Sequence, residues 1–256
     1  MQCDVHGGNL RNLLITISYD GKEFHGWQIQ QNAMTVQEAF QTSLCKIIGD
    51  DFDVKGCSRT DSGVHANMYC ISLKTSHPIE PARLKAALNR WLPLSIAVID
   101  CKQVDDNFHA RYSCVSKEYI YKIWNSEVRN PFLNGYALHY RYKIDEEMLN
   151  KAAQAYVGSY DFTSFCTLDN REVGDMTRTV KAFEVKREGD LVTMKVEADG
   201  FLYNMVRIMV GTLLRIQQGK IPQDGILEII EKKNRQFAGP TAQACGLYLN
   251  KVNYIF

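Results

Sequence analysis

The spacing of hydrophobic and polar residues predicts six elements in the first part of the chain. Strict alternation predicts strands, and apolar residues three or four positions apart predict helices. A capping-box pattern from Thr35 to Glu38 marks one helix start. The predicted elements, in order, are a strand over 13–20, a helix that begins after Thr35, strands near 53–58 and 67–74, a helix from Pro81 to Pro93 and a strand over 94–104. The inward face of the second helix is expected to comprise Leu84, Ala87, Leu88, Trp91 and Leu92.

The second part of the chain repeats this order with one additional helix. Asp145 is a candidate N-cap for a helix that Gly158 ends, with Leu149, Ala152, Ala153, Tyr156 and Val157 on its inner face. The other predicted elements are a strand over 119–124, a hairpin of 177–186 and 191–198, helices over 205–218 and 222–233, and a closing strand over 246–254.

Two β-α-β-β-α-β sequences predict an α+β protein made of two ferredoxin-like halves. We expect antiparallel sheets in both halves, joined around a central cleft. The polar stretch at 105–107 places the boundary between the halves near residue 105, which gives 1–105 and 106–256. The sequence contains no low-complexity linker there, so we expect the halves to pack against each other.

The composition of the 256 residues is that of a globular protein, with 45% hydrophobic and 23% charged residues. No run of about 18 apolar residues could cross a membrane. The N-terminus, MQCDVHGGNL, lacks the basic and apolar regions of a signal peptide. We therefore expect a cytoplasmic protein.

The eight cysteines lack the spacing of metal ligands. None lies two to four residues from another, and no His pair completes a zinc set. Without a signal peptide, we expect reduced and mostly buried thiols, and no metal.

Positive charge is clustered although the formal net charge is only +1. Residues 54–99 hold six Lys or Arg and two acidic residues, a local charge of +4. Residues 201–222 hold Arg207, Arg215 and Lys220 and no acidic residue, a local charge of +3. Taken alone, both clusters indicate solvated faces, and contacts to phosphate groups are the alternative.

The connection over 56–66 is the first candidate for function. It is far longer than a hairpin requires, whereas the matching strands of the second half are joined by three residues. It carries Arg59, Asp61 and His65 together with Gly56 and Gly63, and glycines permit close approach of the backbone to a ligand. The alternative is that Asp61 only forms a local side-chain turn.

Arg207 is the second candidate, because its helix is apolar on nearly every side and should be buried. A buried guanidinium needs an anionic partner in the protein or the phosphate of a ligand. Asp61 is one candidate, and an Asp paired with Arg stays ionised, as a nucleophile or base must be. A purely structural partner such as Asp199 is the alternative.

Aromatic residues stand beside basic ones at 108–112 and 118–122. Alternation places Tyr119 and Tyr121 on one strand face, where rings could stack on an unpaired RNA base. Packing of both rings in a sheet core is an equally common use of such residues.

These motifs, taken together, resemble the tRNA pseudouridine synthase A family over about Leu13 to Tyr254. The loop Arg59-Thr-Asp-Ser-Gly-Val-His-Ala66 is the most specific match. The other matching segments, in order, are Tyr19-Asp-Gly21, Phe24-His-Gly-Trp-Gln28, Phe108-His-Ala-Arg111, Asp161-Phe-Thr-Ser-Phe165, Arg178-Thr179, Asn204-Met-Val-Arg207 and Gly246-Leu-Tyr-Leu249.

The resemblance implies an isomerase that converts uridine to pseudouridine at positions 38–40 of the tRNA anticodon stem-loop. Members of this family use no cofactor or metal and act as homodimers. The partners expected are therefore tRNA and a second copy of the chain, with no membrane.

The resemblance also implies roles for individual residues. Asp61 would be the catalytic carboxylate, Arg207 its paired arginine, and Arg59 the arginine that helps to extrude the base. The substrate-binding residues would be Tyr119, which stacks on the base, Leu247, which lines its pocket, and His65 and Arg111 from the matching motifs.

Three hypotheses of function remain open on the residues alone. The first is this isomerase, with attack at C6, attack at C1′ or a glycal route all open, and with a different RNA target as a variant. The second is a non-catalytic RNA-binding protein, against which the intact Arg59-Thr60-Asp61 loop argues. The third is a small-molecule hydrolase, for which Asp61 lacks a second acidic residue or a His partner at a readable spacing.

Overall fold

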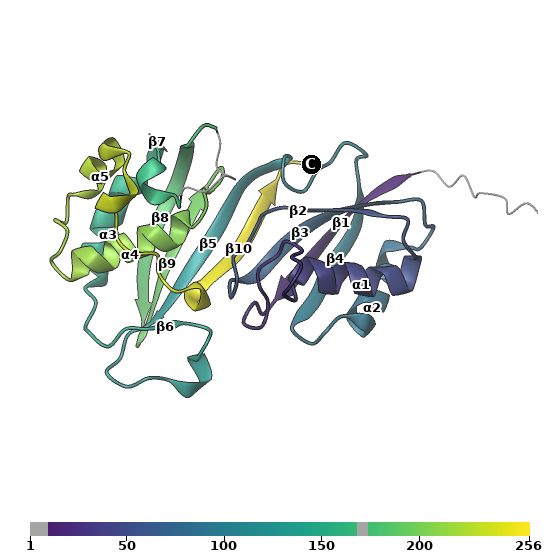
Figure 1. Cartoon of the computed structure of the whole chain (residues 1–256), viewed down its shortest axis with the longest axis horizontal. Coiled ribbons are helices and arrows are strands. Elements are labelled where there is room, and N and C mark those ends of the chain that lie inside the picture. Colours follow the sequence, from purple (N-terminus) through teal and green to yellow (C-terminus); the bar gives the residue numbers. More distant parts are fainter. Residues whose placement is uncertain (1–9, 168–173) are drawn as a thin grey trace, which may run out of the picture. The chain divides into compact units, whose positions relative to one another are not determined.

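The computed structural model describes residues 10–167 and 174–256, so the prediction for the N-terminal segment and Cys3 lies outside the described residues. The chain divides into two compact units (Figure 1). The first contains residues up to Cys114 together with Val252–Phe256, and the second contains Val115–Lys251.

The first unit has the predicted ferredoxin-like topology. Its strands lie in the order β4-β1-β3-β2, and every pairing is antiparallel. The elements are β1 (Arg11–Tyr19), α1 (Val36–Ile48), β2 (Asp53–Gly56), β3 (His65–Thr75), α2 (Pro81–Trp91) and β4 (Ile96–Val104). The connection between β2 and β3, residues 57–64, is the long loop expected from the sequence.

The two helices of this unit begin and pack largely as their sequences predict. Thr35 Oγ1 accepts the backbone N–H of Glu38 at 3.3 Å, which completes the predicted N-cap of α1. Leu84 and Leu88 are fully buried on α2. The prediction that Trp91 faces inward is wrong, because its side chain is 51% exposed. Trp91 is the last residue of α2, and its ring lies 5.1 Å from Lys46 Nζ.

A loop over 105–111 is tied to the sheet of the first unit by polar contacts. Asn12 Nδ2 donates to Asp105 O at 2.9 Å and to Phe108 O at 2.7 Å. Tyr254 Oη donates to Ala110 O at 2.6 Å, and its ring lies 5.0 Å from that of Phe108. Residues 252–256 therefore complete the first unit, although they follow the second in sequence.

The second unit repeats the topology, with strands in the order β10-β5-β9-β8-β7. Its matching elements are β5 (Cys114–Trp124), α3 (Glu146–Ala153), β8 (Thr177–Glu188), β9 (Leu191–Ala198), α4 (Met205–Gln217) and β10 (Leu247–Tyr254). Asp145 caps α3 as predicted, because its Oδ1 accepts the N–H of Met148 at 2.9 Å. The α+β prediction of two ferredoxin-like halves is confirmed in both units.

The second unit also contains elements that the sequence pattern did not predict. Two short strands, β6 (Leu138–His139) and β7 (Gly158–Asp161), pair with β5 and β8. The helix expected over 222–233 is shorter, at α5 (Ile226–Lys232), because Pro222 belongs to a turn in which its carbonyl accepts the N–H of Gly225. None of the described helices is long and apolar enough to cross a membrane.

The N-cap of α1 gives a first test. Thr35→Ala should lower the free energy of unfolding by about 1 kcal/mol, because the N–H of Glu38 loses its acceptor. Thr42→Ala, the same change at an exposed position inside α1, should be neutral or slightly stabilising. Urea unfolding curves of both variants measure the difference. Equal losses in the two would contradict the cap.

Candidate active site

The loop that carries Asp61 is held by the backbone of the segment after β1. Trp27 N–H donates to Thr60 O, and Gly63 N–H donates to Phe24 O, both at 3.1 Å. Tyr19 Oη lies 2.8 Å from Thr60 Oγ1. The residues on both sides of Asp61 are therefore fixed by hydrogen bonds to residues 19–27.

Two glycines permit this close approach of backbones. A β-carbon at Gly26 would lie 2.4 Å from Thr60 O and 3.1 Å from the carbonyl carbon of Asp61. A β-carbon at Gly21 would lie 1.9 Å from Val64 O. Gly26 also has a φ of +81°, which residues with a side chain rarely adopt. The motifs at 19–21 and 24–28 thus position the loop that carries Asp61.

Stacked aromatic rings lie next to the start of the loop. The rings of Trp27 and Tyr69 are stacked with centroids 4.2 Å apart, and a β-carbon at Gly56 would meet both. Tyr69 Oη also donates to Ser58 O. The loop therefore starts from an aromatic cluster whose rings have little freedom to move.

The predicted site residues of the first unit differ in exposure. Asp61 is half-buried, whereas Arg59 and Arg111 are exposed. A carboxylate at a half-buried position can contact a bound molecule while the surrounding loop excludes much of the water. The two exposed guanidinium groups can reach phosphate groups of a ligand.

His65 is almost fully buried, with 1% of its surface exposed. Its Nδ1 accepts the N–H of Gly21 at 3.1 Å and lies 3.1 Å from Asp20 Oδ1. These contacts join the end of the Asp61 loop to the turn after β1. His65 is thus placed to hold the loop.

Arg111 is the last residue of the 105–111 loop described above. His109 Nδ1 accepts the backbone N–H of Arg111 at 3.0 Å, so the His ring fixes the local turn. Burial and the nearby Lys55 charge lower the pKa of His109, which therefore stays neutral and remains an acceptor near neutral pH. The Arg111 guanidinium lies 5.8 Å from the Tyr112 ring.

Arg207 of the second unit lies in the first turn of α4. Ten of the 13 residues of α4 are buried, as expected, but Arg207 itself is only half-buried. The prediction of a buried helix is confirmed, since Met205, Val206 and Ile208 beside it are buried, while the Arg207 side chain itself is partly exposed. The proposed structural partner Asp199 is exposed, and its Oδ1 accepts the N–H of Thr179.

The guanidinium of Arg207 is oriented by two neighbours. Nη1 donates to Asn204 Oδ1 at 2.8 Å, and Nε donates to Ala242 O at 2.8 Å. Asn204 has a φ of +62°, an uncommon conformation for a residue other than glycine. Its Nδ2 donates to Thr167 Oγ1 at 3.0 Å. Asn204 is therefore held from two sides while it holds Arg207.

The segment that supplies Ala242 is bound tightly to α4. A β-carbon at Gly211 would lie 1.7 Å from Pro240 O, so only glycine permits this contact. Gly239 N–H donates to Thr212 Oγ1 at 2.8 Å, and Ala242 N–H donates to Arg207 O at 3.1 Å. The backbone of 239–242 is thereby fixed against the helix that carries Arg207.

Tyr119 and Leu247 lie on neighbouring strands, β5 and β10, and are 6% and 5% exposed. The Tyr119 ring contacts that of Phe201 edge to face, with centroids 5.0 Å apart. Tyr121 is fully buried, and its Oη donates to Gln243 O at 2.7 Å. Burial raises the pKa of Tyr121, so it is a neutral phenol with a structural contact.

The structure therefore groups the predicted residues within each unit. Arg59 and Asp61 share one loop in the first unit, and His65 is the first residue of β3, directly after that loop. In the second, Tyr119 and Leu247 share a sheet, and Arg207 is tied to the segment that precedes β10. The sequence pattern did not predict that Gly26 allows the close approach to Thr60, or that Asn204 orients Arg207. Both residues stand in the motifs that resemble the family, and this was the available signal.

The described residues contain no group of three His, Cys, Asp or Glu side chains that could hold a metal ion. Four of the seven described cysteines are buried and three are half-buried.

Comparison with known proteins gives a consistent result. The sequence profile of a family described as tRNA pseudouridine synthase matches residues 15–113 and 152–255. A tRNA pseudouridine synthase A of Thermoanaerobacter sp. (strain X514) is 42% identical over 245 residues, which cover 96% of this chain and 100% of that protein. A tRNA pseudouridine synthase A 2 of Bacillus cereus is 37% identical over 246 residues, with coverage of 96% and 100%.

A solved Cbf5-Nop10-Gar1 complex includes a chain that aligns with 93% of this chain and 48% of its own length. The sequence identity is 13% and the TM-score is 0.42, which is too low to add to the argument from topology.

The duplicated ferredoxin-like topology and the match over both units define the class of protein: the chain is an isomerase with the fold of pseudouridine synthases. It belongs to the tRNA pseudouridine synthase family. The resemblance inferred from the motifs is thereby confirmed.

The close approach at Gly26 gives a second test, with Gly49 as the matched position. Both glycines have positive φ, but a β-carbon at Gly49 would meet nothing within 4 Å. Both Ala variants carry conformational strain of about 1–3 kcal/mol. Gly26→Ala should be less stable than Gly49→Ala by roughly 2 kcal/mol, because Thr60 must also move. Urea unfolding curves of the two variants measure this difference.

The activity of the two variants should differ as well. Displacing the loop of Asp61 by about 1 Å should lower kcat on the order of 100-fold in Gly26→Ala. Gly49→Ala should keep wild-type kcat. Equal kcat values in the two variants would show that the backbone contact does not position Asp61.

Proposed function

We propose that this enzyme isomerises uridine to pseudouridine at positions 38–40 of the tRNA anticodon stem-loop, with Asp61 as the nucleophile. Pseudouridine formation in tRNA follows from the family to which the chain belongs. The observation that most supports the finer proposal is the rigid presentation of Asp61. A half-buried carboxylate is held in a loop whose neighbouring residues are fixed by backbone hydrogen bonds.

The reaction breaks the bond between N1 of uracil and C1′ of ribose, and forms a bond between C5 and C1′. C5 loses its proton, and N1 gains one, so all atoms stay in the product and no oxidant or reductant is needed. The proposed reaction is therefore redox-neutral and requires no redox cofactor. Asp61 would attack C6 or C1′, or remove the 2′ proton on a glycal route.

In this proposal, Arg207 stabilises the ionised form of Asp61. The support is the fixed direction of its guanidinium, which Asn204 and Ala242 orient through two different nitrogen atoms. Arg59, exposed beside Asp61, would help to extrude the target base from its stack.

Three of the remaining residues would bind the substrate, and the fourth, His65, would support the loop of Asp61. Tyr119 would stack on the uracil, and its hydroxyl is suited to take the proton lost from C5. Leu247, on the neighbouring strand, would line the base pocket. Arg111 would contact a phosphate, and buried His65 would hold the loop from within.

Two further expectations belong to this proposal. We place the reaction in the cytoplasm, where tRNA is processed and thiols stay reduced. We also propose that the active form is a homodimer that binds tRNA with both subunits. Both expectations rest on the likeness to the family rather than on any contact described above.

Asp61→Asn should abolish pseudouridine formation, with a loss in kcat of at least about 1,000-fold, because the amide cannot act as nucleophile or base. Release of tritium from tRNA labelled at C5 of uridine measures the reaction. Binding of tRNA should change less than about threefold. Asp106→Asn, an exposed position in the same unit, is the matched control and should keep full activity. Full turnover by Asp61→Asn would refute the nucleophile.

The target positions can be tested separately from the nucleophile. In cells that lack the gene, pseudouridine should disappear from tRNA positions 38–40 and remain at other positions. Mapping of pseudouridine in total tRNA measures this directly. Loss of pseudouridine at other positions would contradict the proposed target but not the proposed reaction.

A further inference from the structure

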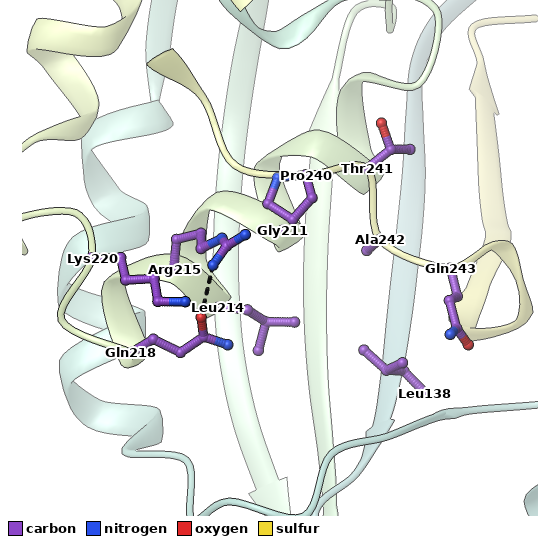
Figure 2. Close-up of a pocket in the computed structure, with 10 residues that line it drawn as sticks. All are labelled: Leu138, Gly211, Leu214, Arg215, Gln218, Lys220, Pro240, Thr241, Ala242 and Gln243. Carbon is purple, nitrogen blue, oxygen red and sulfur yellow. Dashed lines mark hydrogen bonds between the residues drawn. The ribbon is translucent and has the colours of Figure 1, made fainter. Parts of the chain in front are cut away.

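A cavity of about 380 Å³ lies in the second unit (Figure 2). It is bounded by the second half of α4, the turn that follows this helix, β6 and the segment 240–243. This volume falls within the usual range for small-molecule sites. None of the residues given a role in the reaction lines it.

One end of the cavity is basic. Arg215, Gln218 and Lys220 lie together there, and Arg215 Nη1 donates to Gln218 Oε1 at 3.3 Å (Figure 2). This long contact uses one of the five donors of the guanidinium. Among the described residues that line the cavity, none is acidic, so the local charge favours an anion.

The rest of the cavity is largely apolar. Leu138, Leu214 and Pro240 line it, and Figure 2 shows these side chains directed into the same space. Gln218 and Lys220 are exposed, so the basic end opens to solvent. Such a cavity suits a nucleotide of an RNA strand: the base or sugar can occupy the apolar space while the attached phosphate contacts the cations at the open end.

We propose that this cavity binds one nucleotide of the RNA substrate, distinct from the nucleotide that reacts. The phosphate would contact Arg215 and Lys220, and the base or sugar would lie against Leu138, Leu214 and Pro240. The choice of RNA as the ligand rests on the proposed function. Arg215 follows Arg207 by eight residues on α4, which corresponds to about 12 Å along the helix.

The cavity is also connected to the residue proposed to stabilise Asp61. Ala242 lines the cavity and exchanges two hydrogen bonds with Arg207, as donor from N–H and as acceptor at O. The segment 240–243 therefore borders the RNA site on one side and orients Arg207 on the other. A bound nucleotide would further restrain this segment.

The test compares two double variants that remove the same charge. Arg215→Gln with Lys220→Gln alters the cavity, whereas Lys151→Gln with Lys186→Gln removes two exposed lysines elsewhere in the second unit. Binding of unmodified tRNA is measured over a range of salt concentrations, together with kcat and KM. Thermal unfolding confirms the fold, and Lys220→Gln alone, in an exposed turn, serves if the double variant is unstable.

The cavity variant should raise Kd and KM about 10-fold and keep kcat at saturating tRNA. Its plot of log affinity against log salt should lose a slope of about one for each phosphate contact removed. The control pair should change Kd less than twofold. Equal effects of the two pairs would overturn the proposal.

A parallel titration with uridine monophosphate separates a free nucleotide from RNA. Loss of nucleotide binding in the cavity variant with unchanged tRNA affinity would also overturn the proposal. If the wild-type enzyme bound tRNA but formed no pseudouridine, the proposed function would be wrong. The comparison of tRNA affinities between the two double variants would still test whether the cavity binds RNA.

Discussion

The contact between the backbone of residues 58–64 and the segment after β1 is the constraint on which the first unit's site depends. Main chain lies against main chain at Gly21 and Gly26, with no space for a β-carbon at either position. Such contacts restrain position better than contacts between flexible side chains, because the peptide groups have few rotatable bonds. The proposed attack of Asp61 on uridine would need this kind of placement.

In the second unit, hydrogen bonds to a side chain, rather than contacts between backbones, orient the candidate residue. Arg207 is a long side chain with considerable rotational freedom, and its orientation is set by acceptors at two of its nitrogen atoms. One acceptor comes from the strained residue Asn204, and the other from a segment bound to α4 through Gly211. The unfavourable backbone conformation of Asn204 is therefore offset by its side-chain hydrogen bonds, which also fix the direction of the Arg207 guanidinium.

Much of the fold was predictable from the sequence because its signals are local. Capping at Thr35 and Asp145, alternation in the strands and the length of the 57–64 loop all depend on residues close in the chain. β6 escaped prediction because two residues are too few for a period to show, and β7 because its sequence, Gly-Ser-Tyr-Asp, does not alternate between apolar and polar residues. Trp91 was misplaced because helical spacing does not reveal whether the last turn lies over the sheet.

The candidate site was predictable only in part, because some of its contacts join residues far apart in the chain. The residue types in the Arg59–Asp61 loop carry a chemical signal, and the resemblance to the family added their roles. The holding function of Gly26 depends on a contact with Thr60, 34 residues further along the chain. That distance cannot be read from spacing within one segment. The partial exposure of Arg207 was not predictable, because the apolar pattern of a helix does not show which of its positions is left uncovered.

The assignment of residues 252–256 to the first unit has a consequence for synthesis on the ribosome. Tyr254 bonds to Ala110 and contacts Phe108, but it is translated about 140 residues after them. The first unit therefore emerges without its final strand segment and can be completed only after the whole second unit has been made. The last folding step of the first unit therefore follows synthesis of the second unit, even though most of the first unit's sequence comes first.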